Sequence, residues 1–301
     1  PIDVDVTALP PPAPDPELLR PLFQRLQFTN LLADLAARKA PEAHVEQQYD
    51  VVRDAAAFDV LLATLRRGER LAVAGELSPG GVRSRKLGGL AFAWAPGRAS
   101  YVPLDRAEAL RPGGRTAVLA ELGALLAAPT PQKVVHDQKR LLAALRLAGL
   151  PTPTFADDVE LMSYCSDPGT TSHSLEALAL REFAFKKQSP KDLVGAGKKQ
   201  RTFAEVDPAL VASFVDEEAD LILRLHAPLA ERLQKVGTVA LYRELEMPLA
   251  PVLHQMEWEG IALDKDQLAQ LSREMQDRIT TLEARVHERA GHPFNLGSPQ
   301  Q

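Results

Sequence analysis

Residues 207–236 read DPALVASFVDEEADLILRLHAPLAERLQKV, and this stretch predicts one long helix around which the chain is organised. Asp207 supplies an N-cap side chain, and Pro208 has the fixed φ that a first helical turn tolerates. Apolar residues then recur on one helical face, at Leu210, Val211, Phe214, Leu221 and Leu225. Glu218 lies on the same face, so its carboxylate is either an edge residue that reaches water or a metal ligand.

The composition is that of a globular protein. The 301 residues are 45% hydrophobic and 25% charged, a length that accommodates one large and one smaller domain. No apolar run approaches the roughly 20 residues of a membrane-spanning helix, so we expect no membrane partner. The net charge of -5 argues against binding nucleic acid over the whole surface and leaves a local basic face open.

Cysteine and histidine usage restricts the kinds of site that the chain can hold. Cys165 is the only cysteine, which excludes an internal disulfide framework and a thiolate zinc cluster and fits a reducing cytoplasm. His287 and His292 have a spacing close to that of zinc ligands, but no cysteine pair completes a site. We therefore expect surface or capping histidines there.

The N-terminal part predicts a linker followed by short helices. Residues 1–16 contain prolines at positions 10, 11, 12, 14 and 16, which favour an extended, semi-rigid spacer. Leucine and phenylalanine spacing then predicts two short helices before residue 36. Because the chain begins with Pro1 and stops at Gln301 in mid-pattern, we expect a piece of a longer polypeptide.

The segment from about residue 41 to residue 164 predicts a mixed-sheet α/β domain. Strands are expected over 49–52, 71–77, 89–94, 100–104 and 133–136, with a hairpin at Pro96-Gly97. Helices are expected over 55–65, 116–126, 140–148 and 158–164, the last capped by Asp158. An antiparallel meander followed by alternating helices and a short strand indicates this fold class.

Residues 186–201 form a predicted loop with six basic side chains and two glycines, Gly195 and Gly197. The loop either steers a polyanion or is simply solvated, and no aromatic residue is interleaved to stack on bases. It lacks the spacing of a phosphate-binding loop, so we expect no nucleoside-triphosphate site there.

The sequence after Gly237 predicts two helices. The first runs over 241–259, with Pro248 and Pro251 expected to kink it. Asp264 caps the second, whose apolar stripe comprises Leu268, Leu271, Met275, Ile279, Leu282 and Val286. At about 1.5 Å per residue the second helix is roughly 40 Å long. We predict that the two form an antiparallel pair.

Three segments of this C-terminal part resemble one known family. Residues 242–253 (YRELEMPLAPVL), 256–264 (MEWEGIALD) and 290–296 (AGHPFNL) are similar to the start of the polymerase domain in family A bacterial DNA polymerases, the DNA polymerase I family. The resemblance implies that the helix pair is the base of the thumb, which grips duplex product through its sugar-phosphate backbone. It divides the chain into a linker (1–16), a 3′-5′ exonuclease-type domain of RNase H-like fold (17–236) and the start of the polymerase domain (237–301).

The resemblance implies a parent DNA-directed DNA polymerase, a nucleotidyltransferase of replication and repair. Its palm carboxylates, which bind Mg²⁺, and its fingers would follow Gln301, so this segment alone is expected to hold no cofactor and not to polymerise DNA. The expected partners are primer-template duplex and the palm and fingers of the same polypeptide. We expect a monomer in the cytoplasm, associated with the nucleoid.

The exonuclease motifs of the family are degraded in this sequence. Asp-x-Glu falls on Ala74-Gly75-Glu76, and the essential Asp of the second motif falls on Leu141. The third motif, Tyr-x3-Asp, becomes Phe214 to Glu218. Two-metal hydrolysis needs several carboxylates that converge on cations roughly 4 Å apart. With only two carboxylates left, we expect no catalytic residue, no bound metal and an inactive, structural domain.

Two further pairs of polar residues have interpretations of their own. Asp216 and Asp220 lie two residues either side of Glu218 and are expected to face away from it. Asn295 and Ser298 match the family region that touches the primer-strand backbone, with loop capping as the alternative.

A tryptophan and a basic segment are the remaining candidates. Trp258 is expected to be a packing residue. The basic residues Arg83, Arg85 and Lys86 form either a charged turn or a DNA contact.

Two alternative functions of the protein stay open. One is an active 3′-5′ exonuclease with a divergent ligand set, and the other is a stand-alone DNA-binding or scaffold protein.

Overall fold

The computed structural model describes residues 15–298 except 27, 39–46, 196 and 198–199. The predicted linker therefore lies, apart from its last two residues, outside the described part. The chain forms two compact units, Pro1–Trp258 and Glu259–Gln301, each of which is described by itself. No described helix is long and apolar enough to cross a membrane.

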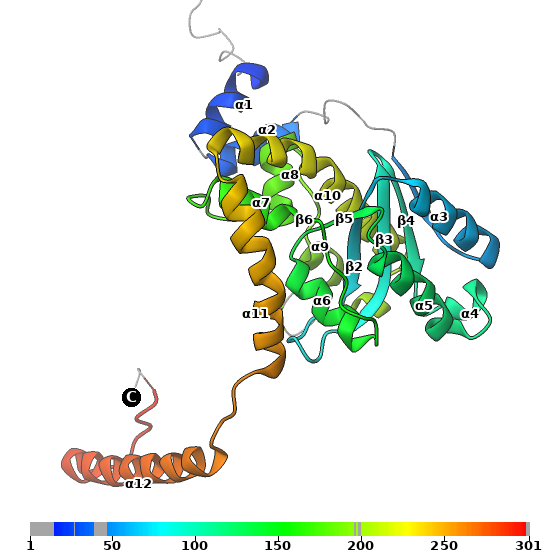
Figure 1. Cartoon of the computed structure of the whole chain (residues 1–301). Helices are drawn as coiled ribbons and strands as arrows, with labels where there is room; N and C mark the ends of the chain where they lie inside the picture. Colours follow the sequence, from blue (N-terminus) through cyan, green and yellow to red (C-terminus); the bar gives the residue numbers. More distant parts are fainter. Residues whose placement is uncertain (1–14, 27, 39–46, 196, 198–199, 299–301) are drawn as a thin grey trace, which may run out of the picture. The chain divides into compact units, whose positions relative to one another are not determined.

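The first unit is built on a six-stranded mixed sheet (Figure 1). Its strands are β1 (Gln48–Val51), β2 (Arg70–Leu77), β3 (Leu87–Ala95), β4 (Arg98–Pro103), β5 (Gln132–Val135) and β6 (Asp157–Asp158). Their spatial order is β1-β4-β3-β2-β5-β6. The β2-β3-β4 meander is antiparallel, whereas β1, β5 and β6 pair parallel with their neighbours. The predicted mixed-sheet α/β class is confirmed.

One face of the sheet carries large side chains. Leu71 and Val73 of β2 and Phe92 of β3 belong to a core that also contains buried leucines of three helices. These helices are α3 (Ala55–Arg67), α5 (Gly114–Ala127) and α6 (Gln138–Leu147), and the short α4 (Ala107–Leu110) joins the same side. The positions of α3, α5 and α6 agree with the predicted helices, whereas α4 was not predicted.

The opposite face is made of alanines. Because side chains alternate along a strand, the neighbours of Leu71 and Val73 point the other way. This second core contains the fully or almost fully buried residues Ala72, Ala74, Ala91, Ala93 and Ala99. The small methyl groups allow a helix to lie close to the backbone of the sheet, and helix α10 (Pro208–Val236) contacts β1 through β5 there. Helices α7 (Val159–Ser166) and α8 (Leu175–Phe183) contact α10.

Helix α10 begins and ends where its sequence predicts. Asp207 is the N-cap and accepts a 2.9 Å hydrogen bond from the Ala209 N–H. Pro208 occupies the first turn, and Gly237 ends the helix with φ +81°. These are local signals, which explains why the N-cap and the first turn were predicted correctly.

Some short elements were not predicted. Helices α1 (Pro16–Arg25) and α2 (Thr29–Arg38) match the predicted lead-in, whereas α8, the two-residue β6 and helix α9 (Pro190–Val194) do not appear in the sequence interpretation. The loop prediction for 186–201 is wrong over α9, where Ser189 and Asp192 form a capping box. Five residues are too few to give a helical periodicity, and a capping box was the only local signal.

The helix predicted over 241–259 is confirmed, with a widened first part. A π segment spans Leu241–Glu246 and continues directly into α11 (Met247–Glu259). Pro248 has no N–H to donate to the carbonyl four residues earlier, and its ring crowds that carbonyl. The Met247 N–H donates instead to the Tyr242 carbonyl, five residues back.

The second unit contains α12 (Lys265–Ala290), whose N-cap Asp264 accepts a 2.9 Å hydrogen bond from the Gln267 N–H, as predicted. The antiparallel pairing of α12 with the preceding helix stays a prediction. The compact units divide after Trp258, because residues 237–258 pack on the first unit. The predicted domain boundary at residue 236 concerns family membership rather than packing and likewise stays a prediction.

Two aspartates of α10 are buried against the sheet, on the side away from Glu218 that was predicted for them. Asp220 is satisfied, since it accepts hydrogen bonds from the Gly97 N–H at 2.7 Å and the Tyr49 hydroxyl at 3.1 Å. Asp216 is 1% exposed, and no described group donates a hydrogen bond to either of its carboxyl oxygens. Burial, and then the charge of Asp50, raises the pKa of Asp216 to about 9. Asp216 is therefore protonated in the folded state at neutral pH.

We expect Asp216→Asn to stabilise the protein at pH 7 and above by about 2 kcal/mol, because the folded state no longer has to hold a proton. The raised pKa means that stability falls as the pH rises from about 4 toward 9, and this slope should flatten in the variant. Urea unfolding at several pH values measures both effects.

Asp220→Asn is the matched comparison on the same helix. This substitution weakens the hydrogen bonds that the buried Asp220 carboxylate accepts, so we expect a loss of about 1–3 kcal/mol in the free energy of unfolding. Equal effects of the two substitutions, or an unchanged pH slope in Asp216→Asn, would contradict this account of the two groups.

Candidate functional site

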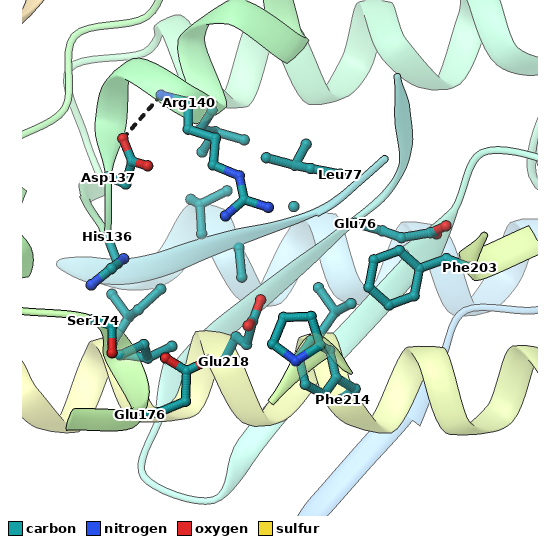
Figure 2. A pocket seen from close by; sticks show the side chains of 18 residues that line it. Glu76, Leu77, His136, Asp137, Arg140, Ser174, Glu176, Phe203, Phe214 and Glu218 are labelled. Atoms are coloured by element: carbon teal, nitrogen blue, oxygen red, sulfur yellow. Dashed lines mark hydrogen bonds between the residues drawn. The ribbon is translucent and has the colours of Figure 1, made fainter. Parts of the chain in front are cut away.

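All five positions predicted from the exonuclease motifs line one cleft of about 170 Å³ (Figure 2). The cleft lies between the end of β2, the start of α6 and the middle of α10. β2 supplies Ala74 and Glu76, α6 supplies Leu141, and α10 supplies Phe214 and Glu218. The fold thus brings together three motifs that are far apart in the sequence.

The two positions at which the family motifs have an aspartate before residue 200 carry only hydrocarbon. Ala74 is 4% exposed and belongs to the alanine face on which α10 packs. Leu141 is also 4% exposed and belongs to the leucine-rich core on the other side. A Cβ at Gly75 would lie 3.0 Å from Leu141 Cδ1, so the two residues are in close contact. Apolar packing now fills these two positions.

Glu76 is engaged by the sheet. The Tyr101 hydroxyl donates a hydrogen bond to Glu76 Oε2, and a Cβ at Gly88 would lie only 2.3 Å from the same carboxyl group. Burial raises the pKa of Glu76, and the hydrogen bond from Tyr101 opposes this rise. Figure 2 shows the Glu76 carboxyl turned away from Glu218.

Glu218 is paired with a buried lysine. Lys187 Nζ lies 3.4 Å from Glu218 Oε1 and 3.8 Å from Glu217 Oε1, and the lysine side chain is fully buried. The same ammonium lies 3.6 Å from the centre of the Phe214 ring and donates a 3.0 Å hydrogen bond to the Gln188 carbonyl. Burial raises the pKa of Glu218, and the charge of Lys187 opposes this rise.

This pair bears on two sequence interpretations. Glu218 was expected to be an edge residue or a metal ligand; its side chain is 21% exposed and pairs with an internal cation. Lys187 belongs to the loop that was expected to steer a polyanion or to be solvated, whereas its side chain is fully buried. Phe214 replaces the family tyrosine, and the face of its ring receives the lysine ammonium.

A second cation enters the cleft from α6. The Arg140 side chain extends into the cleft in Figure 2, and its charge also opposes the rise in the pKa of Glu218. Its backbone N–H donates a 3.2 Å hydrogen bond to Asp137, the N-cap of the helix. Asp137 therefore has a structural partner, although it also lines the cleft.

The donor set does not fit a pair of divalent cations. Such cations need several free carboxylate oxygens at one point. Glu76 is bonded to Tyr101, Glu218 is paired with Lys187, and the remaining three motif positions are apolar. In the described ranges, no group of three or more His, Cys, Asp or Glu side chains is arranged to hold a metal ion.

The predicted DNA contacts lie in the second unit. Asn295 Oδ1 accepts a 3.0 Å hydrogen bond from the Gly297 N–H, and its carbonyl accepts one from the Ser298 N–H. Asn295 thus caps a turn, which was the alternative interpretation, and a DNA contact by Asn295 or Ser298 stays a prediction. His287 contacts the Phe294 carbonyl at 2.9 Å.

The remaining candidates have structural partners. The guanidinium carbon of Arg146 lies 4.0 Å from the centre of the Trp258 ring, which confirms Trp258 as a packing residue. Arg83 donates a 2.6 Å hydrogen bond to the Trp258 carbonyl, and Arg85 donates one of 2.7 Å to the Gly80 carbonyl.

Sequence reasoning missed Arg140 as a member of the cleft, and Lys187 and Tyr101 as the partners of its two carboxylates. Each contact depends on the fold, since Lys187 and Glu218 are 31 residues apart and Tyr101 and Glu76 are 25 apart. The only local signal was the substitution of tyrosine by Phe214, which leaves a ring face for a cation.

Comparison with known proteins gives the family. No protein-family model matches the sequence. The chain is 35% identical over 315 residues to DNA polymerase I of Pseudomonas aeruginosa, covering 100% of this chain and 34% of that protein. It is 33% identical over 293 residues to DNA polymerase I of Rhizobium leguminosarum, covering 89% of this chain and 29% of that protein. The chain belongs to the DNA polymerase I family. It spans about a third of the length of these curated relatives.

Solved structures agree with the fold expected for this part of a DNA polymerase I. The POL domain of Pol1 from M. smegmatis, in complex with DNA primer-template and dNTP, matches with a TM-score of 0.63 and 24% identity, covering 84% of this chain and 39% of that one. Escherichia coli RNase D matches with a TM-score of 0.54 and 15% identity, covering 70% and 51%. The first unit has the RNase H-like fold of 3′-5′ exonuclease domains.

We expect Lys187→Met to lower the free energy of unfolding by about 2–4 kcal/mol, because it removes the ion-pair partner of the Glu218 carboxylate. Adding Glu218→Gln should recover at least half of that loss. Urea unfolding of the two single variants and the double variant measures the coupling.

Lys191→Met is the control, since Lys191 is exposed on α9 and its loss should change stability little. Strictly additive effects of Lys187→Met and Glu218→Gln would show that the two groups do not stabilise each other.

Proposed function

We propose that this chain is the non-catalytic exonuclease-like domain of a DNA polymerase I together with the opening of its polymerase domain. One observation carries the proposal: both surviving motif carboxylates are engaged by groups of the protein, Glu76 by Tyr101 and Glu218 by Lys187. Leu141 and Ala74 occupy the other ligand positions with hydrocarbon. The cleft therefore has no pair of free carboxylates to hold the metal ions that would activate a water molecule.

We infer that the parent protein is a DNA-directed DNA polymerase that extends a primer on a template. The similarity to DNA polymerase I proteins supports this, as does the fold shared with the M. smegmatis domain bound to primer-template and dNTP. Mg²⁺ would be held by the palm of the same polypeptide, and the thumb helices would bind duplex DNA, with Asn295 and Ser298 at the primer-strand backbone. Primer extension by the intact protein tests this assignment.

We expect the intact protein to release no nucleotides from labelled single-stranded DNA in Mg²⁺ or Mn²⁺ above the level of the Glu76→Gln/Glu218→Gln variant. The reason is that neither carboxylate is free to hold a cation. Gel analysis of time courses, with an active DNA exonuclease as the positive control, gives the measurement.

The opposite result has one meaning. Metal-dependent digestion by the unaltered protein that disappears on Glu76→Gln would establish a working exonuclease with a divergent ligand set.

A further inference from the structure

The helix formed by the π segment and α11 is fastened to the exonuclease-like domain at both of its ends. All of the contacts concerned lie within the first compact unit. They join residues 242–258 to β6, to the start of α6 and to the β2-β3 turn.

The first fastening centres on Asp157 of β6, which is 2% exposed. Its Oδ1 accepts a 2.9 Å hydrogen bond from the Tyr242 hydroxyl and lies 2.8 Å from the Arg243 guanidinium. Its Oδ2 lies 2.8 Å from His226 Nε2 on α10. The Tyr242 hydroxyl in turn accepts a 3.0 Å hydrogen bond from the Asp158 N–H.

This arrangement fixes the π segment in position. Tyr242 is fully buried, and its hydroxyl is satisfied as donor and as acceptor. Hydrogen bonds to a buried carboxylate are strong and directional, so a displaced helix would leave Asp157 partly unsatisfied. The Arg243 guanidinium adds a 2.7 Å hydrogen bond to the Ala156 carbonyl.

The second fastening lies at the other end of α11. The Trp258 ring packs beneath the Arg146 guanidinium at 4.0 Å, and Arg146 also donates a 2.7 Å hydrogen bond to Gln255 Oε1. Lys139 forms a 2.6 Å ion pair with Glu257. Arginine suits this position because its planar group stacks on the ring and still donates sideways.

The two faces of this helix differ in kind. Ala250 and His254 are buried against the domain, whereas Leu245, Leu249, Val252 and Met256 are 36–63% exposed. The helix is therefore mounted by one face and presents an apolar stripe on the other.

We propose that the exonuclease-like domain serves as the rigid mount of helix 241–259, with Tyr242 and Arg146 as positioning residues at its two ends. Only the description of this helix as part of the thumb rests on the proposed function. The mount gives a domain without a catalytic centre a role in polymerisation, because a thumb helix held at a fixed angle keeps its grip on the duplex.

Hydrogen exchange of the intact protein tests the mount directly. In Tyr242→Phe, and separately in Arg146→Lys, we expect amides of 241–259 to exchange at least about fivefold faster. Amides of β2, β3 and α5 should keep their rates, which distinguishes a loosened mount from a destabilised domain. Arg66→Lys, on the exposed surface of α3, is the matched control and should change nothing.

The second measurement is primer extension by the same variants. We expect about threefold or greater loss of processivity with an unchanged rate for the first nucleotide, since the chemistry lies elsewhere. Unchanged exchange in 241–259 overturns the mount, and faster exchange with unchanged processivity overturns the positioning role. An intact protein that extends no primer would refute the proposed polymerase function, whereas the exchange rates would still decide the mount.

Discussion

Helix α10 packs on a sheet face made of alanines, and this close contact determines most of what the first unit can do. Alanines of β2, β3 and β4 supply much of the sheet side of this contact, together with Tyr101 and Val134. Val215 and Ala219 fill the interface, Asp216 and Asp220 are buried in it, and Glu218 is placed at its edge beside β2. Ala74 belongs to the same layer, so the loss of a carboxylate at this position extends the apolar contact between helix and sheet.

The chemistry of the cleft follows from how charge is balanced there. In a two-metal nuclease, cations from solution neutralise the converging carboxylates. Here, the protein supplies the balance itself: Lys187 stands beside Glu218, Arg140 enters from α6, and Tyr101 bonds Glu76. A buried pair such as Lys187 and Glu218 is costly to separate, because either partner alone would remain as an uncompensated charge. This balance is the basis on which we propose a domain without metal-dependent nuclease activity.

Sequence patterns predicted the parts of this structure that depend on local signals. The caps at Asp207 and Asp264, the hairpin at Pro96-Gly97 and the mixed sheet follow from residues within a few positions of one another. The partners of Glu76 and Glu218 do not follow from nearby residues, because Tyr101 and Lys187 reach them only through the fold. Lys187 in particular lies in a basic stretch where nothing distinguishes it from the exposed Lys191. The five positions of the cleft were found through family resemblance, whereas their present partners required coordinates.

The central claim is that an internal cation has replaced the metals of the cleft. The most direct test is a crystal structure of the protein grown in excess Mn²⁺, with anomalous scattering recorded to locate the metal. The account predicts no Mn²⁺ in the cleft and the Lys187 ammonium beside Glu218. An anomalous peak shared by Glu76 and Glu218, with Lys187 displaced, would contradict it.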